Sequence, residues 1–329
     1  MKMNIYFKHP LKYRVHINLV RDFGYFLSQQ LQHLDVKVAP EDPNVHLKFF
    51  EINRRIIEKR PRMVFSAKGF SYPSEISSRV ELLIKKIHDG DSILPHLSRS
   101  YLKPNYHDAL LNEWGIHHLH LGTEVDSDGF VNRDRSNPLN DYLLFLRITT
   151  SDAYLIKIGR HNEWTNKELF EVLHENWNDT ISQYQIESGL TLTENEPNEV
   201  ERYKLRKSGI FTLTSAKDGS IYFPIGGGYA SSKNSLKAVR ESQYYLNYLT
   251  HIELSIKNNI TQLIRSMKSI NINIENELIF HLFIFNSKFY LWDTKSNLFI
   301  CLSTSRAYHV PLTTYPKSML ELLLIQNLN

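Results

Sequence analysis

Residues 114–121 read Trp-Gly-Ile-His-His-Leu-His-Leu, with three histidines inside a run that alternates like a β-strand. Successive side chains of a strand point to opposite faces of the sheet, so His118 and His120 share one face. Two further strand-like runs follow at 142–148 and 153–158, joined by a connection of hairpin length. Together the three runs predict an antiparallel sheet, which decides the fold of the middle of the chain.

The two faces of this predicted sheet differ in character. One is apolar and is expected to lie against the core: Leu119, Leu121, Leu144, Leu146, Ile148, Tyr154, Ile156 and Ile158, with His117 on its edge. The other mixes apolar residues with ionisable ones: His118, His120, Leu143, Phe145, Arg147, Leu155 and Lys157, with His161 just beyond the strand. Histidine can exchange protons near neutral pH, and arginine and lysine can hold a phosphate. The mixed face is therefore predicted to be a catalytic or anion-binding surface.

RNA cleavage through the 2′-hydroxyl needs a proton acceptor, a proton donor and cations around the phosphorus, but no metal. A solvated sheet face on which histidine is merely tolerated is the alternative interpretation. A second alternative is a metal site, because His118 and His120 have a spacing that can chelate zinc or manganese. Its third ligand would come from one of four residues: His107, Asp108, His161 or His174. No HExxH or paired-cysteine motif accompanies them, so we predict a site without metal or cofactor.

The composition is that of an ordinary globular protein, with 329 residues, 42% of them apolar and 22% charged. The net charge of +4 and the pI near 8.8 are compatible with an RNA partner, although the charge is spread along the chain. Cys301 is the single cysteine, which favours a reducing compartment. No apolar run reaches the roughly 18 residues of a membrane span, and residues 1–8 lack a signal-peptide core. We therefore expect a cytoplasmic protein that contacts no membrane.

Length and composition predict an α+β protein of two or three domains. Residues 1–58 are expected to form an N-terminal α/β region and residues 59–180 a central domain. A polar linker at 191–199 would separate them from a C-terminal domain at 200–329.

Local patterns predict the elements within these parts. In the first, Val15–Val20 alternates like a strand while a helix through Phe23 and Leu31 competes, and Val45–Phe49 alternates again. The central domain is expected to contain, in chain order, a strand at 62–66, a helix from Ser74 to Ile87, a short helix from Pro104 to Gly115, the three strands, and a helix after the capping box Thr165–Glu168. The C-terminal domain is expected to contain a hairpin at 210–223, a long helix at 235–267 and a second hairpin at 278–292.

The order of a strand, two helices and three antiparallel strands resembles the small fold of RelE/ParE-type toxins, within the barnase–EndoU–colicin–RelE-like group of bacterial ribonucleases. The resemblance covers residues 60–178 and rests on this order and on the cationic face, whereas the long loop Gly122–Asn140 departs from the compact toxin. It implies a toxin-like or phage-defence endoribonuclease that acts without metal. The residues carrying that activity would be His118 or His120 as the base, the other histidine or His161 as the acid, and Arg147 and Lys157 as phosphate clamps.

Two further features are candidates for ligand binding. Gly226-Gly-Gly228 precedes the long helix, with Lys233 close to the helix start, and backbone amides at a helix N-terminus can bind an anion. A tight strand-to-helix turn is the alternative, since Gly-Lys-Ser/Thr is absent and no dinucleotide fingerprint is evident. Trp164, which follows the third strand, could stack on a nucleobase or pack in the core.

The apolar positions of the long helix at 235–267 recur in steps close to those of a coiled-coil seam. This pattern indicates either a packing stripe within the chain or a helix that binds a second copy or a protein such as an antitoxin. The chain could then be a non-catalytic interaction or regulatory protein of a bacterial defence or toxin–antitoxin system. A metal-dependent nuclease or phosphoesterase is the third hypothesis.

Overall fold

The computed structural model describes residues 13–134, 136–186, 196–269, 271–272, 274, 276–285 and 288–302. Its described residues divide into two compact units. Unit 1 comprises those up to His33, Lys37–Val45 and those from Gln243 onward, and unit 2 comprises Leu34–Val36 and His46–Ser242. The fold is α+β, as predicted, but the division differs from the three consecutive segments expected, because the N-terminal strand pairs with a strand near the other end of the chain.

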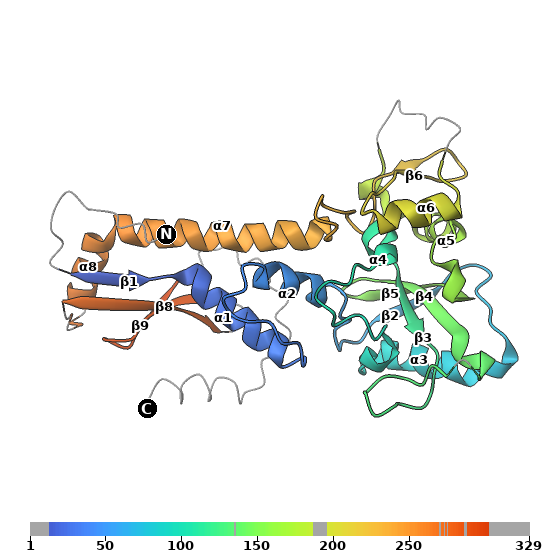
Figure 1. The fold of residues 1–329 in the computed structure, drawn as a ribbon, viewed down its shortest axis with the longest axis horizontal. Coiled ribbons are helices and arrows are strands. Elements are labelled where there is room, and N and C mark those ends of the chain that lie inside the picture. The colour runs from blue at the N-terminus through green and yellow to red at the C-terminus, as the bar shows by residue number, and fades with distance from the viewer. Residues whose placement is uncertain are drawn as a thin grey trace. The chain divides into compact units, whose positions relative to one another are not determined.

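Unit 2 is built around a four-stranded sheet of order β2-β5-β4-β3 (Figure 1). Its strands are β2 (Met63–Ser66), β3 (His117–His120), β4 (Tyr142–Ile148) and β5 (Asp152–Arg160). Strand β4 pairs antiparallel with both β3 and β5, whereas β2 runs parallel to β5 at the edge. The predicted antiparallel arrangement of the three central strands is therefore confirmed.

Helices cover both faces of this sheet. Helix α3 (Ser77–Asp89) packs Val80, Leu83 and Ile87 on the face that carries Leu119 and Leu144. Its stripe was predicted, and its end at Gly90 follows from the left-handed backbone of that residue (φ 82°).

The opposite face was predicted to be a cationic surface, and this expectation is wrong. Its apolar residues Leu143 and Phe145 are fully buried in a second core. Two helices supply the rest of that core, α4 (Ala109–Trp114) and α5 (Glu168–Trp177). Strand alternation showed which side chains share the face but not that helices cover it.

A β-bulge in β5 changes which residues face which core. Phe145 pairs with Lys157, whereas the next residue of β4, Leu146, pairs with Leu155, so Ile156 is skipped. Leu155 consequently lies in the core on the α3 side and Ile156 in the core on the α4 and α5 side. The strict alternation predicted for this strand placed both on the opposite faces, because a bulge shifts the period by one residue.

Other elements of unit 2 are short. Helix α2 (Val45–Asn53) corrects the strand predicted at 45–49; its buried residues include Val45, Phe49 and Ile52, a helical spacing that a five-residue window hides. Helix α6 (Glu199–Lys207) follows the predicted linker, of which residues 191–195 lie outside the described residues. The first C-terminal hairpin is reduced to two-residue strands, β6 (Thr214–Ser215) and β7 (Ile221–Tyr222). The remaining elements are single 3-10 turns: η1 (Ser74–Ile76), η2 (Leu94–His96), η3 (Pro138–Asp141), η4 (His161–Glu163), η5 (Asn178–Thr180) and η6 (Ser182–Tyr184).

Unit 1 contains a second four-stranded sheet, of order β1-β8-β9-β10. Its strands are β1 (Arg14–Ile17), β8 (Glu277–Phe285), β9 (Lys288–Asp293) and β10 (Leu298–Cys301). Strand β1 pairs parallel with β8, and the other pairs are antiparallel. Helix α1 (Leu19–Gln32) follows β1 directly, so the strand and the helix that were predicted as alternatives at 15–31 are both present, one after the other. The second predicted hairpin is present as β8 and β9, whereas β10 was not predicted.

The predicted long helix is interrupted. Helix α7 (Leu236–Asn258) ends before Asn259, and α8 (Ile260–Ser269) continues the chain. In unit 1, Tyr245 of α7 is buried, and its ring centroid lies 5.6 Å from that of Phe23 and 6.1 Å from that of Phe289. This part of the apolar stripe therefore packs within the chain, and its role in self-association stays a prediction. Within the described residues, no helix combines the length and apolarity needed to cross a membrane.

Candidate functional site

A cavity of about 380 Å³ lies in unit 2, between α4, β3, α6 and the turn before α7. Five of its lining residues are cationic or ionisable nitrogen groups: His107, His118, Arg206, Lys207 and Lys233. Four are aromatic: Tyr106, Trp164, Tyr203 and Tyr229. His118, Trp164 and Lys233 were predicted as site residues, and the structure brings them together here.

Local backbone geometry places the side chains that line the cavity. His118 projects from the middle of β3, opposite Phe145 of β4. His107 precedes Asp108, whose carboxylate caps α4 by accepting a hydrogen bond from the Leu111 amide at 3.0 Å. Lys233 has a left-handed backbone (φ 67°), and its side chain lies so close to Gly209 that a Cβ there would meet its Cγ at 2.6 Å. The glycine after α6 thus leaves space for this lysine.

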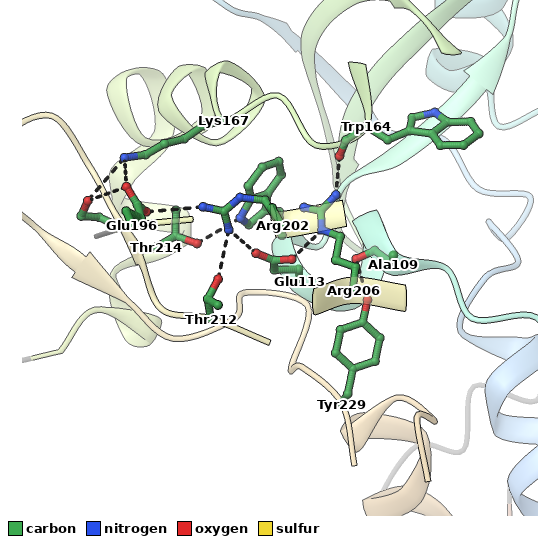
Figure 2. Close-up of polar contacts among 12 residues, drawn as sticks. Ala109, Glu113, Trp164, Lys167, Glu196, Arg202, Arg206, Thr212, Thr214 and Tyr229 are labelled. Carbon is green, nitrogen blue, oxygen red and sulfur yellow. Dashed lines mark hydrogen bonds and ion pairs between the residues drawn. The ribbon is translucent and has the colours of Figure 1, made fainter. Parts of the chain in front are cut away.

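A buried ion-pair network holds Arg206 at the cavity wall (Figure 2). Glu113 of α4 accepts hydrogen bonds from Arg202 Nη1 at 2.5 Å and from Arg206 Nε at 2.6 Å. The side chains of these three residues are at most 3% exposed. Arg206 also lies over the ring of Trp114, 4.4 Å from the ring centroid. The network therefore fixes α6 against α4 and orients the guanidinium of Arg206.

The same network reaches Trp164, one of the predicted site residues. Arg206 Nη1 donates a hydrogen bond to the backbone carbonyl oxygen of Trp164. Figure 2 shows the indole extending away from the carboxylate of Glu113. The indole is 39% exposed, which is high for a large apolar ring, and it lines the cavity. Trp164 is thus anchored through its backbone, and its ring lies beside those of His118 and His161 with part of the residue exposed at the cavity.

Three nitrogen atoms of the cavity residues have no hydrogen-bond partner among the described residues: Nη2 of Arg206, Nδ1 of His118 and Nδ1 of His107. Buried polar groups are almost always paired, and an unpaired one costs about 1–3 kcal/mol. Burial also lowers the pKa of His118 and of His107, since it disfavours the charged form. Both imidazoles are therefore mainly neutral at pH 7, and three nitrogen atoms of residues that line the cavity are buried without a hydrogen-bond partner in the described structure.

The other predicted histidines lie next to His118. The ring centroids of His118 and His120 are 6.0 Å apart, and His161 lies 5.1 Å from His120. Burial, with the nearby cation Arg133 contributing, lowers the pKa of His120 to about 2, so this imidazole is neutral near pH 7 and is not the general acid that was predicted as one option. His161 Nδ1 lies 2.7 Å from Asp141 Oδ1, which fixes its ring beside Trp164. The cluster supports the cavity wall, but neither His120 nor His161 lines the cavity.

The two predicted phosphate clamps are engaged elsewhere. Lys157 Nζ lies 2.8 Å from Glu163 and 2.6 Å from Glu168, so two carboxylates neutralise it. The half-buried Arg147 donates from Nη2 to the carbonyl oxygen of Thr180 at 3.4 Å and does not line the cavity. Sequence periodicity shows on which face of the sheet a cationic side chain lies. It does not show which hydrogen-bond acceptors contact that side chain, and for this reason both residues were predicted as phosphate clamps.

The glycine loop, Gly226–Gly228, does not present its backbone amides to an anion, because they are hydrogen-bonded within the protein. Its amides donate to carbonyl oxygens: Gly226 to Glu113 at 3.1 Å, Gly227 to Pro224 at 2.8 Å and Gly228 to Asn112 at 2.8 Å. The loop therefore fastens the segment before α7 to the end of α4. Of the residues predicted in this region, only Lys233 lines the cavity.

Gly226→Ala is expected to destabilise unit 2 by roughly 1–3 kcal/mol, the range for overpacking. A Cβ at this position would meet the carbonyl oxygen of Leu111 at 1.9 Å and that of Asn112 at 2.4 Å, both in backbone that cannot yield cheaply. Urea unfolding monitored by fluorescence measures the loss. Gly219→Ala is the control, since a Cβ there meets no atom within 4 Å and brings only the strain of its positive φ. Equal losses for the two variants would contradict the close-approach argument.

Sequence reasoning missed the contribution of α6. Tyr203 and Lys207 are four residues apart and share one side of the helix, where both line the cavity. The signal was present, because Asn198 followed by Glu201 forms a capping box that marks the start of a helix. His107 was considered only as a metal ligand.

No group of three or more His, Cys, Asp or Glu side chains within the described ranges is arranged to hold a metal. Comparison with known proteins identifies no relative: no family model, no curated protein and no solved structure matches the chain. The resemblance to RelE/ParE-type toxins therefore stays a prediction, and the function must be argued from the cavity.

Proposed function

We propose that unit 2 is a metal-independent endoribonuclease whose active site is the cavity between α4, β3 and α6. One observation carries the proposal: the cavity combines the buried His118 and the half-buried His107 with an arginine whose Nη2 is unpaired in the described structure. Lys207 and Lys233 add exposed cations at its rim. These are the groups that in-line attack of a 2′-hydroxyl on phosphorus requires.

The reaction follows from the state of these groups. His118, neutral because it is buried, accepts the proton of the 2′-hydroxyl while the 2′-oxygen attacks the adjacent phosphorus. The bond from phosphorus to the 5′-oxygen breaks, and His107 returns a proton to that leaving oxygen in the minority of molecules in which it is protonated, a fraction that grows as the pH falls. The products are a 2′,3′-cyclic phosphate and a 5′-hydroxyl. Arg206 Nη2 and the two lysines would stabilise the negative charge that develops on the phosphoryl oxygens.

Exposed aromatic rings favour RNA among phosphate-bearing ligands. Tyr203 is 56% exposed and Trp164 is 39% exposed, and both line the cavity. Bases stack on such rings with a gain of about 1–3 kcal/mol each, and the gain depends little on sequence. The proposal keeps the class of reaction and the role of His118 predicted from the sequence. It gives the clamp role of Arg147 and Lys157 to Arg206, Lys207 and Lys233.

His118→Ala and His107→Ala are each expected to lower the cleavage rate by about 100-fold or more, the usual contribution of a general acid or base. The assay follows a 5′-labelled single-stranded RNA with the purified chain in EDTA. His88→Ala is the matched control, because His88 is an exposed histidine of the same unit. An oligonucleotide lacking the 2′-hydroxyl should not be cut.

Full activity in both cavity variants, or cleavage of the 2′-deoxy strand, would overturn the mechanism. Inhibition of bacterial growth on expression, lost in His118→Ala but retained in His88→Ala, would extend the proposal to a toxin. If the wild-type chain does not cleave RNA in EDTA, the proposal of a metal-independent ribonuclease is wrong.

The cleavage rate is expected to be highest below pH 6.5, the ordinary histidine pKa, and to fall as the pH rises toward 8. Catalysis needs one imidazole neutral and the other protonated, and burial lowers the pKa of both His107 and His118. The protonated acid is therefore lost as the pH rises through this lowered range. Initial rates on RNA between pH 5.5 and 8.5 test this, and an optimum above pH 7.5 would contradict it.

A further inference from the structure

One face of the unit 1 sheet carries a continuous set of aromatic rings. Phe289 of β9 packs toward α1 and α7, where its ring lies 6.1 Å from Phe23 and 6.0 Å from Tyr248. Because side chains alternate along a strand, Tyr290 and Trp292 of β9 point to the opposite face. Directly paired residues of neighbouring strands share a face, so Phe283 (paired with Tyr290), Phe285 (paired with Lys288) and Phe299 (paired with Trp292) lie on that face too. We call that set the aromatic face: Phe283, Phe285, Tyr290, Trp292 and Phe299.

The rings of the aromatic face contact one another across three strands. Trp292 and Phe299 are stacked, with centroids 5.7 Å apart and planes inclined by 4°. Phe283 lies 5.2 Å from Phe299 and 6.3 Å from Tyr290. Phe299 is 39% exposed and the others are half-buried, so part of the surface of each residue stays open.

A hollow of about 780 Å³ that contains basic side chains adjoins this face. It is lined by residues of β1, α1, α7 and β8, among them Arg21, Lys257 and His16. His281 belongs to both features: it lines the hollow, and its ring centroid lies 6.4 Å from that of Trp292. The hollow and the aromatic face therefore form one continuous surface of unit 1.

Two of the basic residues of the hollow are paired: Lys257 Nζ lies 2.5 Å from Glu253 and His16 Nε2 lies 2.9 Å from Glu277, which leaves Arg21 and His281 to face a ligand. The carboxylate of the hollow, Asp22, accepts a hydrogen bond from the Leu282 amide at 2.9 Å and lies 3.2 Å from His281. This contact raises the pKa of His281 and favours its cationic form. The Arg21 guanidinium lies over the Tyr25 ring at 5.4 Å and makes no ion pair with a carboxylate of the described residues.

We propose that unit 1 binds single-stranded RNA, with bases stacked on the aromatic face and phosphates held in the adjoining hollow by Arg21 and His281. Stacking rings beside a cationic groove are the two features with which proteins hold a single strand independently of its sequence. An apolar protein partner would gain from the rings but not from the cations beside them. The inference concerns a second contact with RNA and does not require cleavage at the unit 2 cavity.

Fluorescence anisotropy with a labelled 2′-O-methyl oligouridine measures this binding, because the strand lacks the 2′-hydroxyl and cannot be cut. The double variant Trp292→Ala/Phe299→Ala in the full chain is expected to bind at least tenfold more weakly, since each stacked base contributes about 1–3 kcal/mol. Trp292→Tyr should restore most of the affinity that a single Trp292→Ala loses. Leu254→Ala is the matched control, because Leu254 is an exposed apolar residue of the same unit.

The electrostatic half of the proposal has its own test. Arg21→Gln should weaken binding and lower the slope of log affinity against log salt by about 0.7, the value for one phosphate contact with a single strand. Circular dichroism of each variant separates a lost contact from a lost fold. Unchanged affinity in the folded double variant overturns the proposal.

Two other results would also overturn it. One is equal affinity for a duplex, whose bases cannot stack on the protein. The other is light scattering that shows a wild-type dimer dissociated by Phe299→Glu, which would assign the face to a second copy. Loss of cleavage in His118→Ala with oligouridine binding retained would separate this site from the unit 2 cavity. Loss of binding in His118→Ala alone, with the double aromatic variant unaffected, would place all RNA binding in unit 2.

Discussion

Glu113→Ala is expected to lower the free energy of unfolding of unit 2 by about 3–5 kcal/mol, the cost of breaking a buried ion pair by removing one partner. The carboxylate accepts from two guanidinium groups, and all three side chains are at most 3% exposed. Without Glu113, two buried cations would remain with their main counter-ion gone. A loss of this size is a large part of the roughly 5–15 kcal/mol that holds a domain folded.

Urea unfolding followed by tryptophan fluorescence measures this loss. The chain has four tryptophans, three of them in unit 2, so a Trp292→Phe background makes the signal report on unit 2. Glu175→Ala is the matched control, because Glu175 forms an exposed ion pair with Lys217, which is worth about 0–1 kcal/mol. The triple variant Glu113→Leu/Arg202→Met/Arg206→Met should regain stability, since apolar replacement of a whole buried network is tolerated. A Glu113→Ala loss no larger than the control would refute this account of the network.

Unit 2 is also expected to lose stability steeply as the pH falls from 6.5 toward 4. Burial is the main cause that lowers the pKa of His96 and His117 to about 4 and that of His120 to about 2. In His96 the geometry agrees: Nδ1 donates to the His120 carbonyl oxygen at 2.7 Å, and Nε2 accepts from Lys86 Nζ at 3.3 Å. These three imidazoles are neutral in the folded protein and become protonated when the chain unfolds.

The sign follows from proton uptake. Below pH 6.5 the unfolded chain binds protons that the folded chain does not, so stability falls as the pH falls. Each group contributes about 1.4 kcal/mol per pH unit, and the three together cost about 6 kcal/mol at pH 5. Unit 1 has a contribution of the opposite sign, because Asp22 raises the pKa of His281, and that stabilisation is lost as the pH rises.

Urea unfolding at pH 7, 6 and 5 in the Trp292→Phe background measures the slope. His96→Gln should reduce it by about one proton, because the amide can keep one hydrogen bond without titrating. His88→Gln, a change at an exposed histidine of the same unit, should leave the slope unaltered. A free energy of unfolding that stays flat between pH 7 and 5 would show that the three imidazoles are not held neutral.

Periodicity and capping predicted the parts of unit 2 that depend on neighbouring residues. The three antiparallel strands and the apolar stripe of α3 are examples, since the pattern that predicts each element lies within a short stretch of sequence. The parallel pairing of β1 with β8 was not predictable in this way, because its partners are more than 250 residues apart. The bulge that skips Ile156 was equally hidden, since an apolar residue fits either face of a sheet that is buried on both sides.

The candidate site shows the same division. His118 could be identified from strand alternation, and Trp164 from its place after the third strand, but the cavity they share depends on α6 and on Lys233. Arg147 and Lys157 were chosen for their charge, although the acceptors that engage them come from distant or downstream segments. Charge can be read from a sequence, but whether that charge is available depends on three-dimensional partners.

The pairing of β1 with β8 also sets the order in which the molecule can be made. During synthesis, β1 and α1 emerge first, but β1 has no strand to pair with until about residue 277 has been added. Unit 2 is encoded almost entirely between these two points, so it can fold while unit 1 is still incomplete. Closing so long a loop is slow, because chain entropy must be given up before the contacts form. We therefore expect a nascent chain to complete the cavity first and the aromatic face last.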